Sequence, residues 1–176
     1  MPRFELQRAA DKLIREVFVV KPGEVVVITA DTGSDPELVH VVASSVYSAG
    51  GKPMVITIAE PSGVGKAADA DIPVEELTGV LMHCDVWIEF NRQWLLYSTP
   101  FERAIAGNPK LRYMCLVDFD GGLLERVVGK VETAQLQKFM TRVAQMHENA
   151  TQLRVTTPGG TDVSFLMDHT HTISND

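Results

Sequence analysis

Two histidines near the end of the chain, His169 and His171, are the residues best suited to hold a transition metal. In an extended strand, side chains two positions apart lie on the same face, so both imidazoles would point the same way. Two imidazoles form only half of a metal site, and no cluster of Cys, Asp or Glu accompanies them in the sequence. We name them as candidate metal ligands, beside the simpler interpretation of a solvated chain segment.

A second set of polar residues follows predicted strands and could face a ligand or a partner domain. In open α/β sheets, ligands bind beyond the carboxyl ends of the strands. Asp31 and Ser34 also fit a simpler role as caps of the next helix, and Asp118 fits a turn before a helix. The candidate residues of this edge are Asp31, Ser34, Asn91, Arg92 and Asp118.

Other motifs do not reach a recognisable catalytic pattern. The pair Gly65-Lys66 has Glu60 where a phosphate-binding loop needs a glycine. Ala67 stands where the same loop needs Ser or Thr. No Gly-x-Gly-x-x-Gly follows the first strand, and no Gly-x-Ser-x-Gly elbow is present. We therefore assign no catalytic residue and no cofactor-binding residue to this chain.

Strands and helices alternate along the first 150 residues. Continuous β-branched runs predict strands buried on both faces, and the segments between them have helical periodicity and caps. This order is typical of a three-layer α/β/α fold with a mostly parallel sheet of four or more strands. The predicted strands are 25–29, 54–58, 85–90 and 112–117; the helices include 4–20, 73–82, 99–107, 122–128 and 131–149, and residues 59–72 are a predicted loop.

The last part of the sequence has a different pattern. Residues 153–157 and 161–166 flank Pro158-Gly159-Gly160, which predicts a β-hairpin. We expect an α/β domain over residues 1–150, and a hairpin over residues 151–176 that begins a truncated C-terminal catalytic domain.

The composition and charge of the chain limit the kinds of partner that it can bind. The 176 residues carry a net charge of −7, which argues against nucleic acid, since phosphate neutralisation needs surplus Lys and Arg. No apolar run could span a membrane, and the first residues do not resemble a signal peptide, so we expect no membrane partner and a cytoplasmic location. Cys84 and Cys115 fall at or in predicted buried strands and are interpreted as core residues.

Several segments together resemble the N-terminal half of the aminopeptidase T type of metallo-aminopeptidase, often labelled leucyl aminopeptidase. They equally resemble the related 2,5-dihydroxypyridine 5,6-dioxygenases, which open a pyridine ring with non-haem iron. The resemblance covers nearly the whole chain. The segments that resemble the aminopeptidases are Lys21–Val26, Ser48–Gly51 and Thr157–Phe165. Those that resemble the dioxygenases are Ser34–Pro36, Leu95–Ser98 together with Glu102, and Thr151–Phe165.

The resemblance implies a divalent metal (Fe, Zn, Mn or Co) in the full-length protein, with its ligands in a C-terminal half beyond this chain. No metal is then expected in this fragment, whose main partner would be the missing catalytic domain. The first hypothesis is the N-terminal domain of an aminopeptidase-like hydrolase. The alternatives are the same domain of a ring-cleaving dioxygenase, or a stand-alone small-molecule binding module. Because an unfinished second domain would expose strand edges, we also expect a homodimer.

Overall fold

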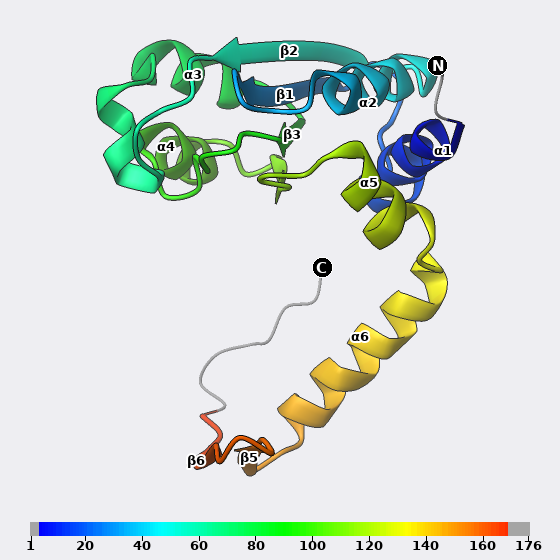
Figure 1. Ribbon diagram of the computed structural model, residues 1–176, viewed down its shortest axis with the longest axis vertical. Coiled ribbons are helices and arrows are strands. Elements are labelled where there is room, and N and C mark those ends of the chain that lie inside the picture. The colour runs from blue at the N-terminus through cyan, green and yellow to red at the C-terminus, as the bar shows by residue number, and fades with distance from the viewer. Residues whose placement is uncertain (1–3, 169–176) are drawn as a thin grey trace. The chain divides into compact units, whose positions relative to one another are not determined.

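A computed structural model of the chain describes residues 4–168. The chain divides into two compact units, Met1–Val131 and Glu132–Asp176. The first unit contains a four-stranded sheet in the order β2-β1-β3-β4, with every neighbouring pair parallel (Figure 1). Its strands are β1 (Val25–Asp31), β2 (Lys52–Ile58), β3 (Val86–Glu89) and β4 (Arg112–Cys115). The predicted parallel sheet is confirmed.

Helices cover both faces of this sheet. One face packs against α1, α2 and α5, and the other against α3 and α4. Alternate residues of β1 serve the two sides, since Val26 and Ile28 belong to one core cluster and Val27 to the other. The predicted three-layer α/β/α fold is therefore confirmed. The helices are α1 (Phe4–Lys12), α2 (Pro36–Ser48), α3 (Val74–Leu81), α4 (Thr99–Gly107) and α5 (Gly121–Leu124), and π-helical turns at Leu13–Val17 and Glu125–Gly129 extend α1 and α5.

Three sequence-based predictions need correction. The first strand reaches Asp31, so this residue belongs to the sheet and not to the following loop. The predicted loop at residues 59–72 contains a 3-10 helix, Gly65–Ala70. The first residue of this helix donates its N–H to the carbonyl oxygen of Trp94, a contact between distant segments that the sequence does not reveal. Cys84 is a core residue as predicted, but Cys115 is only half-buried, since it lies on the edge strand β4.

The second unit consists of α6 (Thr133–Glu148) and an antiparallel hairpin of β5 (Gln152–Thr156) and β6 (Asp162–Leu166). The predicted hairpin is present, and its turn places Gly160 at a φ of 103°, which glycine adopts without strain. Both core clusters of the sheet come from residues 6–128, so α6 groups with the hairpin. The boundary between compact units thus falls at 131/132 and differs from the predicted domain boundary at 150/151.

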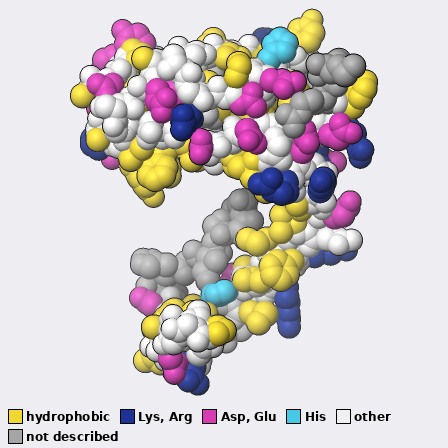
Figure 2. Space-filling model, in the orientation of Figure 1, with side chains coloured by type: hydrophobic (Ala, Val, Ile, Leu, Met, Phe, Trp, Pro, Cys, Tyr) yellow, Lys and Arg dark blue, Asp and Glu magenta, His cyan; other side chains and the backbone are white. Residues whose placement is uncertain are grey.

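Apolar side chains of the second unit remain exposed. Ala144 is the one buried side chain of α6. Figure 2 shows apolar side chains gathered along this helix. A two-stranded hairpin is marginally stable alone, and exposed apolar patches of this kind mark interaction surfaces. The exposed large apolar residues are Leu136, Phe139, Met140, Met146, Val155, Val163, Phe165 and Leu166. Over residues 4–168, no helix has the length and hydropathy needed to cross a bilayer.

Val19, which follows the π-helical turn, has a φ of 49°. This left-handed conformation strains a β-branched residue, whereas glycine adopts it freely. Its side chain is mostly exposed, so little packing is lost on truncation. We expect Val19→Gly to raise the free energy of unfolding by about 1 kcal/mol, measured by thermal unfolding. The matched change Val17→Gly, inside the helical turn, should lower stability; a loss in both variants would contradict the argument.

Candidate functional site

The carboxyl edge of the sheet is organised around Asp31, the last residue of β1. Its carboxylate is buried and accepts hydrogen bonds from backbone N–H groups of two loops. Oδ1 accepts from Gly33 N at 2.9 Å, while Oδ2 accepts from Arg92 N at 2.7 Å and Gln93 N at 3.2 Å. Asp31 therefore ties the loop after β1 to the loop after β3, and its oxygens are occupied by these donors.

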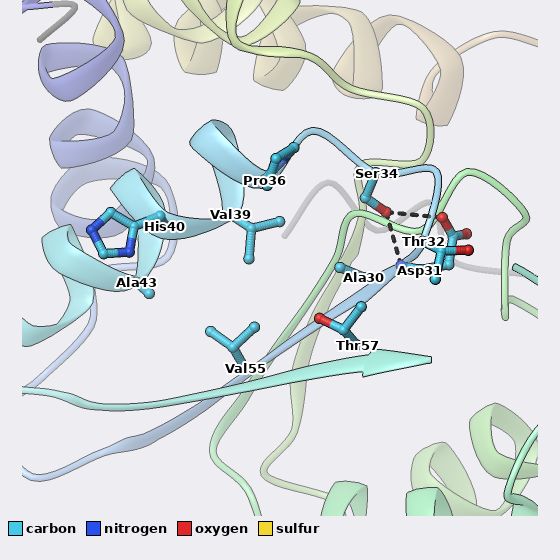
Figure 3. Close-up of a pocket in the computed structure, with 10 residues that line it drawn as sticks. All are labelled: Ala30, Asp31, Thr32, Ser34, Pro36, Val39, His40, Ala43, Val55 and Thr57. Carbon is cyan, nitrogen blue, oxygen red and sulfur yellow. Dashed lines mark hydrogen bonds between the residues drawn. The ribbon is translucent and has the colours of Figure 1, made fainter. Parts of the chain in front are cut away.

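Ser34 joins the same network from the start of α2. Its Oγ accepts a hydrogen bond from Asp31 N at 2.9 Å. The single hydroxyl proton is shared between Asp31 Oδ1 at 3.1 Å and the carbonyl oxygen of Phe90 at 2.9 Å. Figure 3 shows the two contacts between Ser34 and Asp31. The helix cap itself is Asp35, whose Oδ1 accepts from the N–H groups of Glu37 and Leu38, so Ser34 is free to bridge two strands.

Asn91, Arg92 and Asp118 complete this edge. Asp118 N donates to the carbonyl oxygen of Asn91 at 3.1 Å, and its carboxylate lies 3.5 Å from Arg92 Nε. The Arg92 side chain is 53% exposed, so its guanidinium can reach a ligand. The Asn91 side chain is fully buried, and neither its nitrogen nor its oxygen has a hydrogen-bond partner. The structure thus brings the five predicted edge residues together; their contact with a ligand stays a prediction.

A buried acid that the sequence reasoning missed lies on the α3–α4 face of the sheet. Glu89 is the last residue of β3 and is fully buried. Its carboxylate accepts hydrogen bonds from Leu95 N and from the hydroxyl of Tyr113. Burial raises the pKa of the Glu89 carboxyl, and burial together with the nearby Glu89 raises the pKa of the Tyr113 hydroxyl. A single acidic residue in an otherwise apolar strand was the sequence signal that could have located it.

Glu89 should make the stability of the chain depend on pH. Its pKa lies above the ordinary 4.5 when folded, so the folded state holds the proton more tightly. This tighter proton binding stabilises the folded state fully at pH values below the ordinary pKa, and the stabilisation is lost as pH rises through the raised pKa. Gln at position 89 cannot ionise. The free energy of unfolding of Glu89→Gln should therefore rise relative to that of the wild type as pH increases toward the raised pKa, by about 1.4 kcal/mol for each pH unit.

The measurement is urea unfolding at a series of pH values, followed by the fluorescence of the buried Trp87. The control is Glu76→Gln, an exposed glutamate in the first turn of α3, which should follow the wild-type curve. Parallel pH curves for Glu89→Gln and the wild type would refute the role given to Glu89.

A pocket of about 450 Å³ opens between α2 and the edge strand β2 (Figure 3). This volume lies within the range of small-molecule sites. Its polar end is the Asp31–Ser34 turn, and the rest is a mostly apolar groove along the outer edge of the sheet. The lining residues are Ala30, Asp31, Thr32, Ser34, Pro36, Val39, His40, Ala43, Val55 and Thr57.

The loop after β3, at the carboxyl edge of the sheet, also carries exposed aromatic side chains. Tyr97 is 64% exposed and has a φ of 67°, a strained backbone conformation of the kind that clusters at ligand sites. Trp94 is partly exposed, and its carbonyl oxygen accepts from Gly65 N at 2.9 Å. The Ser98 side chain then caps α4 by accepting from Phe101 N. The loop is thus anchored at both sides while its aromatic rings face outward.

The donor groups of this edge do not form a metal site. Over residues 4–168, no group of three or more His, Cys, Asp or Glu could hold a metal ion. The oxygens of Asp31 are engaged by backbone donors. His169 and His171 lie outside the described residues, so their role as metal ligands stays a prediction.

These features define a class of protein: an open α/β domain with a parallel sheet and a polar edge at the carboxyl ends of its strands, the edge at which ligands of such sheets bind. A sequence model of the 2,5-dihydroxypyridine 5,6-dioxygenase family matches residues 11–175. The chain belongs to this family. A comparison with curated protein sequences gives no match.

Two solved structures share the fold. The 2,5-dihydroxypyridine dioxygenase of Pseudomonas putida KT2440 has a TM-score of 0.67 and 16% identity, covering 93% of this chain and 47% of its own. AmpT from Thermus thermophilus has a TM-score of 0.52 and 10% identity, covering 90% of this chain and 58% of its own. The resemblance to both groups is thereby confirmed. The chain spans about half the length of these two relatives.

Proposed function

We propose that the chain is the N-terminal α/β domain of a ring-cleaving dioxygenase that acts on dihydroxypyridines. The observation that carries this proposal is the family match over residues 11–175. In this role the carboxyl edge of the sheet forms one wall of the substrate cleft. The aminopeptidase hypothesis that came first from sequence has support from fold alone, so the dioxygenase alternative takes precedence.

The chemistry of the edge supports a planar, hydroxylated substrate. A pyridine ring can stack on the exposed ring of Tyr97, and aromatic pairs of this kind contribute about 0.5–1.5 kcal/mol. The Arg92 guanidinium can donate a charge-assisted hydrogen bond to a phenolate-type oxygen. Asp31 holds the backbone of Arg92, so the guanidinium extends from a fixed anchor. These residues bind and orient the substrate.

Iron is the metal that this function requires, and the described residues do not supply its ligands. We propose that a further catalytic domain brings the ligands and covers the exposed apolar side chains of α6 and the hairpin. A cytoplasmic location is part of the same proposal.

The test is an assay of the complete reading frame that encodes these residues. The protein is expressed with iron, and the loss of 2,5-dihydroxypyridine is followed by absorbance together with oxygen consumption. Parallel samples with zinc, manganese or cobalt are assayed on aminoacyl-arylamides. Oxygen-dependent loss of the pyridine supports the proposal. Arylamide hydrolysis, or pyridine binding without turnover in the iron-loaded protein, would refute it in favour of a peptidase or a binding module.

A further inference from the structure

The edge strand β2 is an unusually open surface. It has β1 on one side and no neighbouring strand on the other among residues 4–168. From Pro53 to Ile58 it carries no charge, and Met54 and Val55 are each 45% exposed. Proteins commonly protect such edges with charged residues, proline, short strands or bulges, because an open apolar edge pairs with other strands. On β2 these devices are confined to its first two residues, Lys52 and Pro53, so the rest of the strand is unprotected. The opposite edge, β4, is only four residues long and begins with Arg112.

The backbone groups that β2 presents outward can be assigned from one bond. Lys52 N donates to Glu24 O at 2.7 Å, so the N–H of Lys52 points toward β1. Directions alternate along a strand, so Val55 and Thr57 direct their N–H and C=O groups outward. Pro53 also faces outward, where its lack of an N–H leaves no bond to β1 unmade. The free edge therefore offers two donors and three acceptors.

We infer that β2 pairs with β2 of a second copy of this chain, antiparallel and with Val55 opposite Val55 on a two-fold axis. In this register the two Val55 residues exchange both backbone bonds. Thr57 N of each copy donates to Pro53 O of the other. Because Pro53 has no N–H, the return bond to Thr57 O is not made, and each of these pairs holds one bond in place of two. The two sheets become one continuous sheet, and the apolar groove between α2 and β2 lies along the seam.

The charges at the two ends of β2 favour the antiparallel arrangement. Lys52 begins the strand, and Glu60 follows its last residue by two positions; both side chains are exposed. Antiparallel pairing about Val55 sets Lys52 opposite Ile58 and brings it toward Glu60 of the other copy, at both ends of the seam. Parallel pairing would instead set like charges side by side. The surface is thus complementary to itself in both hydrogen bonds and charge.

The experiment uses light scattering and sedimentation of the 176-residue chain. The wild type is expected to be a dimer. Val55→Lys places two ammonium groups on the two-fold axis and should convert the dimer to a monomer, with at least a 100-fold weaker dissociation constant, an estimate of about 3 kcal/mol. The matched control is Val163→Lys, a 50% exposed strand valine in the hairpin, which should leave the dimer intact.

A second variant tests the register. Residues directly opposite in a hydrogen-bonded antiparallel pair have Cα atoms about 5.5 Å apart, and their Cβ atoms are wider apart than a disulfide needs but within reach of a short thiol-to-thiol cross-linker. Val55→Cys should therefore be joined to its partner copy by such a cross-linker, whereas Val163→Cys should not. Cross-linking at position 55 tests the proposed pairing even if Val55→Lys does not fold. A monomeric wild type, no cross-link at position 55, or a dimer that only Val163→Lys dissociates would overturn the inference. Loss of dioxygenase activity plays no part in this test, so it stands independently of the proposed function.

Discussion

Replacing Asp31 by Asn is expected to destabilise the sheet domain by about 1–3 kcal/mol. The buried carboxylate accepts hydrogen bonds through both oxygens from backbone N–H groups of the two loops. Asn has one acceptor oxygen, and its amide N–H₂ would face at least one of these donors. That donor then loses its partner beside a buried side chain, and a donor left without an acceptor is the costly way to break a hydrogen bond. Urea unfolding followed by Trp87 fluorescence measures the loss.

The control for this change is Asp120→Asn, which is chemically the same substitution at an exposed site. Asp120 caps α5 by accepting from Leu123 N at 2.7 Å, and Asn caps a helix as well as Asp does. Its stability should stay within about 0.5 kcal/mol of the wild type. If Asp31→Asn were equally mild, Asp31 would not be the anchor of the two loops.

Removing the Arg92 side chain is expected to lower kcat/KM for 2,5-dihydroxypyridine by about 10- to 100-fold, the range for a lost charge-assisted hydrogen bond. This prediction rests on the proposed function and uses the complete enzyme. The stability of Arg92→Ala should hardly change, because the guanidinium is exposed and its ion pair with Asp118 is long at 3.5 Å. The loss should appear in oxygen-coupled turnover and leave the unfolding curve in place.

The matched control is Arg103→Ala on α4. Arg103 is 48% exposed, close to the 53% of Arg92, and forms a short surface ion pair with Glu75. It lies within α4 and not in a loop that follows a strand, so its removal should leave kcat/KM near the wild-type value. Equal effects of the two changes would assign the loss to general surface charge and not to a ligand contact at Arg92.

The elements of the fold follow from local rules that the sequence carries. The β-branched run at 25–29 predicts a buried strand because side chains alternate across a sheet. Asp35 and Pro36 begin a helix, since a side-chain acceptor and a proline both suit its first turn. That Asp31, Asn91 and Asp118 lie at one edge could be predicted because each falls at or just after the end of a strand, and parallel strands end at one edge.

Contacts between distant residues were decided by tertiary structure. The bond from Arg92 N to Asp31 spans 61 residues, and that from Tyr113 to Glu89 spans 24, and no local pattern encodes either. The strand order β2-β1-β3-β4 makes β2 an edge, although its sequence is as apolar as that of a central strand. The sequence by itself determined which segments are strands and helices, because periodicity and capping act within a few residues. Only packing decided which strand lies at the edge, which acid is buried and which loops Asp31 joins, because these depend on neighbours that the chain brings together as it folds.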